Sequence, residues 1–368
     1  MSTATSTPAD PDAQVGAYAE QLFGLGLAAF EAATITIGRE TGLYAALAAN
    51  GPADAATVAI AAGVDVRYAQ EWLDQQAAAG LIETNAAAEA TARTFSLSEA
   101  AQVCLLDPDS LASTGPLFDF LPAVGALLPS IVTAFRTGAG IPYADYAVHD
   151  AQGDFNRPAF LHLLATEWLP AVDGLRDRLS APGARVAEFG SGEGWAAIAI
   201  ARAFPTVHVD GFDLDDASVV AARKHAAEAG VTDRVHFEVA DVTDVTAIPT
   251  TGYDLVCAFE MIHDLAHPVE ALANMRRIAA PDATVLVVDE NVGDEFAAPT
   301  ENPVERLFYA ASVLHCLPVG RCEDHSEATG TVMRPSTFRA YAERAGFTGV
   351  EILPIHHDLF RFYRLVSA

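Results

Sequence analysis

Residues 186–195, VAEFGSGEGW, decide the fold of this chain. An apolar run typical of a buried strand precedes three glycines at alternate positions, Gly190, Gly192 and Gly194, and an apolar run with helical spacing follows them. Glycine lacks a Cβ atom and tolerates left-handed backbone conformations, so a glycine-rich turn between a strand and a helix lets the backbone approach a ligand closely. The glycine spacing alone is a weak signal, and the residues around the turn must indicate which ligand the turn binds.

The segments after residue 184 alternate between strand-like and helix-like patterns. Strands are predicted at ARVAEFG, TVHVDGFDL, RVHFEVA, YDLVCAF and ATVLVVDEN, with helical runs between most of them. Two later strands, GVEILPI and DLFRFYRLV, are separated by a short link, so we expect them to pair antiparallel. Such alternation is typical of a doubly wound parallel sheet. The predicted fold class is α/β, a Rossmann-like seven-stranded domain whose last strand is antiparallel.

The N-terminal part has a different pattern, which is mostly helical between residues 20 and 105. Three helical runs are followed by two short extended pieces around a polar turn, LIETNAAAEATARTFSLS, and this order is typical of a winged helix. We therefore predict a disordered tail at 1–18, a winged-helix-like dimerisation domain at 19–110, a helical connector and substrate lid at 111–180, and a ligand-binding catalytic domain at 181–368.

The acidic balance of the chain argues against nucleic acid and anionic membranes as partners. The formal net charge is −28, and residues 1–110 hold three arginines, no lysine and fourteen acidic residues. Such a surface repels phosphate groups, whereas a winged helix that reads DNA needs a basic face. A role in dimerisation and in covering the substrate is therefore the favoured interpretation of this domain.

Several sequence features predict a cytoplasmic protein without a membrane span. There is no uninterrupted apolar stretch of 18 residues, and the N-terminus lacks the basic and apolar regions of a signal peptide. The four cysteines, Cys104, Cys257, Cys316 and Cys322, lack CxxC spacing, as expected for a reduced compartment.

Acidic residues at three successive strand ends indicate the ligand of the glycine turn. Glu188 lies two residues before Gly190, Asp213 ends the second predicted strand, and Asp241 follows the third. A dinucleotide fingerprint would be GxGxxG, whereas here the third glycine comes one position too early, and Glu188 would repel a pyrophosphate. A carboxylate there suits the ammonium group of an amino acid, and the two later acids suit a ribose and an adenine amine. This combination points to S-adenosylmethionine.

The region 184–366 resembles class I S-adenosylmethionine-dependent methyltransferases, and 20–366 is similar to bacterial members that add a winged-helix dimerisation domain, as plant-type O-methyltransferases do. The segments GLYAALA, RYAQEWL, AFRTGAGIPY, VLHCLPVG and RFYRL carry this resemblance. It implies a homodimer that methylates a small molecule. The cofactor residues that it implies, from the methionine part through ribose and adenine to the sulfonium pocket, are Glu188, Gly190, Gly192, Gly194, Asp213, Leu214, Asp241, Val242 and Phe259.

The segment FEMIHDLAHP, residues 259–268, places His263 and Asp264 just after the fourth predicted strand. In plant-type O-methyltransferases a His-Asp pair stands at this position, so His263 is a candidate general base. The alternative is a metal site formed by His263, Asp264 and His315, which resembles bacterial C-methyltransferases of α-keto acids and would bind a divalent or ferric ion. The plainest interpretation is that Asp264 caps the next helix and His315 is a core residue.

The acceptor itself is not identified by the sequence. Arg136 is a candidate partner for a substrate carboxylate, and Tyr143 and Trp168 are candidate walls of its pocket. A zinc site from His315, Cys316, Cys322 and His325 lacks the usual paired spacing. Methylation of O, N or C stays open, as does a non-catalytic alternative, a DNA-binding regulator that uses the cofactor fold as a sensor.

Overall fold

The computed structural model describes residues 11–249 and 252–367, and the chain divides into two compact units, Met1–Leu121 and Pro122–Ala368. Helix α1, Pro11–Glu40, begins the described part. The expected disordered tail at 1–18 therefore needs a correction, because residues 11–18 are helical, and its remaining part, 1–10, lies outside the described residues.

The first unit has the predicted order of helices and hairpin. Its elements are α1, α2 (Leu43–Asn50), α3 (Ala55–Ala62), α4 (Val66–Ala78), β1 (Glu83–Thr84), η1 (Ala90–Ala92), β2 (Phe95–Ser96), α5 (Glu99–Leu106) and the start of α6 (Pro116–Thr137). Aspartates fix where helices begin: Asp54 accepts the N–H of Thr57 at α3, and Asp65 accepts that of Arg67 at α4. The antiparallel β1–β2 pair is the wing, so the predicted winged helix is confirmed.

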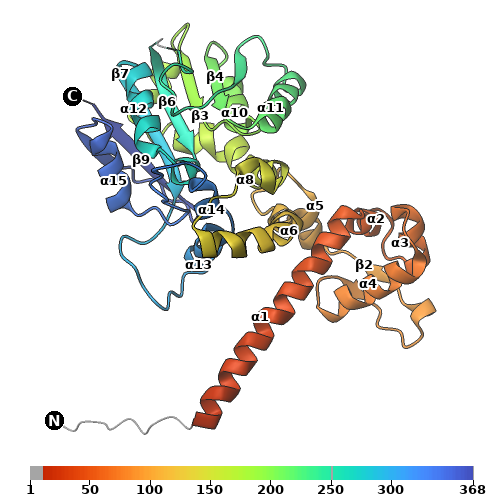
Figure 1. Ribbon diagram of the computed structural model, residues 1–368. Coiled ribbons are helices and arrows are strands. Elements are labelled where there is room, and N and C mark those ends of the chain that lie inside the picture. The colour runs from red at the N-terminus through yellow and green to blue at the C-terminus, as the bar shows by residue number, and fades with distance from the viewer. Residues whose placement is uncertain (1–10, 250–251, 368) are drawn as a thin grey trace, which may run out of the picture. The chain divides into compact units, whose positions relative to one another are not determined.

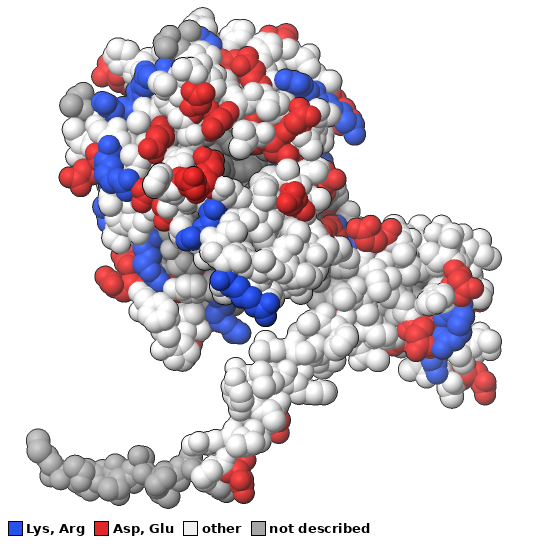
Figure 2. All heavy atoms as spheres, in the orientation of Figure 1, with Lys and Arg blue, Asp and Glu red and all other residues white. Residues whose placement is uncertain are grey.

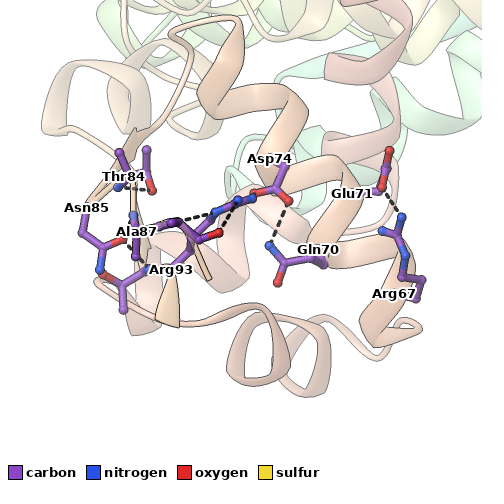
Figure 3. A network of polar contacts seen from close by, with 11 residues as sticks. Arg67, Gln70, Glu71, Asp74, Thr84, Asn85, Ala87 and Arg93 are labelled. Atoms are coloured by element: carbon purple, nitrogen blue, oxygen red, sulfur yellow. Dashed lines mark hydrogen bonds and ion pairs between the residues drawn. The ribbon is translucent and has the colours of Figure 1, made fainter. Parts of the chain in front are cut away.

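Each of the three arginines of the first unit is held by a carboxylate of the same unit. Arg67 pairs with Glu71 one turn along α4, and Arg93 reaches from the wing to Asp74 at 2.7 Å (Figure 3). Arg39 pairs with Asp119 at 2.6 Å. These cations are already compensated, which agrees with the argument from charge against a DNA-reading face.

The second unit is built on a seven-stranded sheet. Its strands are β3 (Arg185–Phe189), β4 (His208–Asp213), β5 (Val235–Val239), β6 (Tyr253–Phe259), β7 (Ala279–Glu290), β8 (Gly349–Ile352) and β9 (Phe360–Val366). Their spatial order is β5-β4-β3-β6-β7-β9-β8. Strand β9 pairs antiparallel with both β7 and β8, whereas β5, β4, β3, β6 and β7 run parallel. The predicted α/β fold with an antiparallel last strand is confirmed.

Helices cover both faces of this sheet (Figure 1). Alternation along β3 sends Val186 into one core with α10 (Trp195–Ala203) and α11 (Asp216–Glu228), and Ala187 into the other core with α12 (Pro268–Ile278) and α15 (Pro335–Arg344). The remaining elements are α7 (Tyr143–Tyr146), α8 (His149–Ala159), η2 (Phe160–Trp168), α9 (Leu175–Leu179), η3 (Ile262–Asp264), α13 (Pro303–Ala311), η4 (Ser312–Cys316) and α14 (Leu317–Gly320). Parallel strands that end together create the edge where a ligand binds.

Two helices leave large apolar side chains exposed. On α1, Phe23 is 74% exposed and Phe30 is 79% exposed, and Figure 2 shows this helix with few charged side chains. On α6, Leu128, Val132 and Phe135 are exposed. By length and composition alone, both helices could cross a membrane, although little of either is buried within the chain.

Candidate functional site

A cavity of about 380 Å³ lies at the carboxyl ends of β3, β4 and β6, within the second unit. One part is formed by the glycine turn and the strand ends. The other part is formed by α7, α8 and the segment that follows β6. The polar side chains that α7 and α8 contribute to this lining are Tyr143, His149, Gln152 and Asn156.

The three glycines of the turn are needed for different reasons. All have positive φ, at 66° for Gly190, 48° for Gly192 and 81° for Gly194. A Cβ atom on Gly190 would lie 2.7 Å from the side chain of Met261, and one on Gly194 would lie 2.5 Å from Phe237. A Cβ atom on Gly192 would meet nothing within 4 Å, so this glycine faces open space in the cavity. Gly192 is therefore the position where a ligand can lie against the backbone.

Glu188 is a buried carboxyl group that faces the cavity. Its side chain is 2% exposed, and Oε2 has no hydrogen-bond partner among the described residues. Burial raises the pKa of Glu188 to about 8. A buried acceptor atom without a donor is costly, so this carboxyl group suits a ligand that brings an ammonium group.

The part of the cavity that is formed by the glycine turn and the strand ends is called the cofactor half below. Away from Glu188, it presents carboxylates and an exposed apolar side chain. Asp213 accepts the N–H of Gly192 at 2.7 Å and that of Asp215 at 2.9 Å, which ties the glycine turn to the end of β4. Asp241 accepts the N–H and hydroxyl of Thr243. Leu214 is 69% exposed beside them. This arrangement fits a ribose at Asp213 and a flat base over Leu214.

Eight of the nine expected cofactor residues line this one cavity. The exception is Gly194, which precedes α10 and gives Phe237 the space to pack. Phe259 closes the inner end, with its ring centroid 5.3 Å from that of Phe160.

His263 lies beneath the cavity and does not line it. Its side chain is 3% exposed, Nδ1 is 2.9 Å from carboxylate oxygens of both Asp289 and Glu290, and Nε2 is 3.2 Å from Asp264. Burial lowers the pKa of His263, but Glu290, Asp264 and Asp289 outweigh it, so the pKa lies well above the usual value. The ring is thus an imidazolium whose two nitrogens both face carboxylates.

Asp264 is the member of the His-Asp pair that reaches the cavity. Burial opposes its ionisation, but the His263 charge and hydrogen bond lower the pKa of Asp264 to about 2. Ligand atoms of His263 and Asp264 lie within 4.8 Å of the Cys316 sulfur, in a group that does not include His315. His315 instead packs between aromatic rings, 4.5 Å from Tyr146 and 5.7 Å from Tyr143, with Nε2 buried and unpaired among the described residues. The expected His263–Asp264–His315 triad is not assembled in this geometry.

The three expected acceptor residues have different positions. Tyr143 lines the cavity and donates to Gln152 at 3.1 Å. Arg136 is exposed on α6 and Trp168 is 1% exposed in the core against Phe362, so neither lines the cavity and both expectations need correction. An aromatic residue on a helix face is most often a core residue, as Trp168 is.

The part of the cavity that is formed by α7, α8 and the segment after β6 is called the acceptor half below. Sequence reasoning missed several residues in it. Gln152 and Asn156 are four positions apart on α8 and share one face, a spacing that could have been noticed. Glu260 follows Phe259 directly with φ 51°, a left-handed conformation that is uncommon outside glycine. No pattern in the sequence indicates that backbone conformation.

Comparisons with known proteins agree with this geometry. Residues 180–334 match the family model described as a methyltransferase domain, and residues 29–105 match the Rv2258c-like winged HTH domain. A ubiquinone biosynthesis O-methyltransferase of Hahella chejuensis is 29% identical over 53% of this chain and 76% of its own length. Two solved structures share the fold: the mitomycin 7-O-methyltransferase MmcR (20% identity, TM-score 0.71, 97% and 100% of the chains covered) and human N-acetylserotonin methyltransferase in complex with S-adenosylmethionine (16%, 0.68, 99% and 100%).

Proposed function

We propose that this chain is a class I S-adenosylmethionine-dependent methyltransferase with an N-terminal winged-helix domain. In this proposal it methylates a small molecule that is bound between α8 and the segment after β6. The unpaired Oε2 atom of Glu188 beside the open backbone at Gly192 carries this proposal, because it fits the methionine end of the cofactor. The cavity continues from there past Phe259 to Glu260 and Asp264.

When bound, the cofactor supplies a methyl group already activated on a sulfonium. The protein then has to orient the acceptor in line and exclude water. Phe160 and Phe259 wall the inner cavity with apolar rings, and Tyr143 and Gln152 cover it with polar groups. A hydroxyl acceptor is what the names of the curated relatives favour for this site.

The His263–Asp264 pair has, in this proposal, an electrostatic role under the acceptor. Both nitrogens of the imidazolium face carboxyl groups, of which Asp264 and Asp289 have lowered pKa values and Glu290, through burial, a raised one. The ring has no free nitrogen for a further proton, so Asp264 is the group of the pair that meets the acceptor. His263 holds Asp264 ionised and in position. This role differs from direct proton abstraction by His263, the sequence-based hypothesis.

The cofactor site predicts a measurable proton release. At pH 7 a group with a pKa of about 8 is mostly protonated, so ion pairing with an ammonium group should expel about one proton from Glu188. Calorimetric titration of S-adenosylmethionine in two buffers of different ionisation enthalpy measures this number. In Glu188→Gln we expect no release from this site and at least about tenfold weaker binding.

Glu238→Gln is the matched control, because Glu238 is exposed on β5 and does not line the cavity. It should bind and release protons as the parent protein does. Tight cofactor binding by Glu188→Gln with the same proton release would contradict the assigned place of the methionine end.

A metal-assisted reaction on an α-keto acid is a second candidate. The group of His263, Asp264 and Cys316 favours it, although the donor set does not fit while His263 is an ion-paired imidazolium. Elemental analysis after purification without chelators tests it, with Cys316→Ser beside His315→Ala. Stoichiometric metal that is lost only in Cys316→Ser would support this candidate, and metal-free active protein would refute it.

We further propose that a second copy of the chain covers the exposed apolar residues of α1. Burying an aromatic side chain contributes about 1.5–3 kcal/mol, so a helix that exposes Phe23 and Phe30 is suited to association. The double variant Phe23→Glu/Phe30→Glu should weaken a dimer at least about 100-fold. Chromatography with light scattering would then show one-chain mass in place of two-chain mass.

Ile60→Glu is the control for this test, because Ile60 is also exposed, at 82%, but lies on α3. It should leave the mass unchanged. A monomeric parent protein that floats with lipid vesicles would instead show that the apolar helix meets a membrane.

A further inference from the structure

The acceptor half of the cavity has an uneven balance of charge. Eight carboxylate side chains line the whole cavity, and no lysine or arginine is among its described lining residues. Glu188, Asp213, Asp215 and Asp241 belong to the cofactor half. Glu193 belongs to the glycine turn, and the acidic residues left for the acceptor half are Glu260, Asp264 and Glu323. Burial raises the pKa of Glu260 to about 8, whereas the pKa of Asp264 is lowered to about 2. An anionic acceptor would meet the Asp264 carboxylate and no lysine or arginine among the described lining residues, so it would be disfavoured there.

Two buried acceptor atoms in this half have no donor. Asn156 is 8% exposed, and its Oδ1 has no hydrogen-bond partner among the described residues; the same is true of Oε1 of Glu260. The Asn156 amide donates to Glu260, which leaves its oxygen as the unpaired atom. Both residues line the cavity. A ligand that donates hydrogen bonds would satisfy both atoms, and one that offers only acceptors would leave them unpaired.

The backbone holds Glu260 at the right place for this task. The N–H of Glu260 donates to Val288 at 2.8 Å, and its φ of 51° turns the chain sharply at the end of β6. Its neighbour Phe259 packs on Phe160, one turn beyond Asn156. Strain of this kind at a cavity is a frequent mark of a functional position. Glu260 therefore lies beside the inner wall, where the methyl group would be transferred.

The phenol group of Tyr143, which lines the cavity, shows how the surrounding charges act on a hydroxyl group there. Burial, followed by Asp213, Asp215, Asp264 and Glu193, raises the pKa of Tyr143 far above its usual value. A hydroxyl group of an acceptor in the same cavity would also stay protonated and would remain a donor. An amino group would be stabilised in its cationic form by the same carboxylates.

We propose that Glu260 and Asn156 form a recognition pair that selects a methyl acceptor with an uncharged or cationic donor group, a hydroxyl or an amino group, and disfavours a carboxylate there. This inference rests on the proposed function, since it names the acceptor class of the same site. It also disfavours α-keto acids, whose carboxylate finds no lysine or arginine among the described lining residues.

Three probes of similar size, benzylamine, benzyl alcohol and benzoate, test the pair. Each is titrated by ligand-observed NMR against protein saturated with S-adenosylhomocysteine. We expect binding of the amine and the alcohol and at least about tenfold weaker binding of benzoate. Glu260→Gln should weaken benzylamine at least about tenfold, and Asn156→Leu should weaken both donors, while affinity for S-adenosylhomocysteine stays within about threefold.

Glu351→Gln is the matched control, because Glu351 is exposed on β8 and pairs with Arg364 away from the cavity. It should leave all three affinities unchanged. The inference is overturned if benzoate binds as tightly as benzylamine, or if Glu260→Gln binds benzylamine as the parent protein does. It is also overturned if neither benzylamine nor benzyl alcohol binds. Failure to bind S-adenosylhomocysteine would instead overturn the proposed function, so the two failures are distinct.

Discussion

Replacing Asp213 by alanine should weaken binding of S-adenosylhomocysteine at least about 100-fold. Asp213 lines the cavity and accepts backbone N–H groups from Gly192 and Asp215, so one side chain holds both the glycine turn and the turn after β4. In the proposed complex it also accepts two ribose hydroxyls. Hydrogen bonds to a charged group contribute about 1.5–3 kcal/mol each, and the loss of two exceeds a factor of 100 in affinity.

Calorimetric titration measures this effect, and Asp216→Ala is its control. Asp216 lies three positions away in the first turn of α11, is exposed and does not line the cavity. Its variant should bind like the parent protein. Affinity of Asp213→Ala within about fivefold of the parent value would show that the ribose lies elsewhere.

The cofactor half could be predicted from the sequence because its residues follow strand ends. Parallel strands bring their carboxyl ends to one edge, so the alternation of strands and helices predicts that Glu188, Asp213 and Asp241 converge there. The residues that contact His263 could not be predicted from the sequence in this way. Asp289 and Glu290 end β7, the neighbour of β6, but a short acidic pair after an apolar run is common and indicates no partner.

The acceptor half could not be predicted in the same way. Its residues come from α7 and α8, which precede the sheet in sequence, and helix positions relative to a sheet depend on packing and not on a local pattern. The sequence offers Arg136 and Trp168 as candidates by their side-chain chemistry alone. Trp168 packs in the core on β9, whose Phe360 and Phe362 face it. The left-handed backbone at Glu260 could not be predicted either, because glutamate rarely adopts a positive φ.

Replacing His263 by leucine should destabilise the second unit by about 3–5 kcal/mol, because it removes the cation from a buried group of carboxylates. Asp264, Asp289 and Glu290 all lie within 3.2 Å of the ring nitrogens. Chemical denaturation followed by circular dichroism measures the free energy of unfolding. His236→Leu is the control, because His236 is exposed on β5. Equal stabilities of the two variants would contradict the ion-paired state of His263.

The difference in stability between the parent protein and His263→Leu should depend on pH in a defined direction. The pKa of His263 is raised in the folded state, so its contribution is complete below the unfolded value of about 6.5 and is lost as pH rises through the folded value. The pKa of Asp264 is lowered to about 2 and that of Asp289 is also lowered, so their contributions are complete above about pH 4 and are lost on acidification. In His263→Leu the buried Asp264 and Asp289 lose the charge that lowers their pKa values, and burial already raises the pKa of Glu290, so the variant loses further stability as pH rises above about 4. The difference should therefore fall on acidification from about pH 4 to about pH 2, where Asp264 and Asp289 lose the charge that pairs with His263. A difference that is unchanged over this range would contradict the ion-paired state of His263.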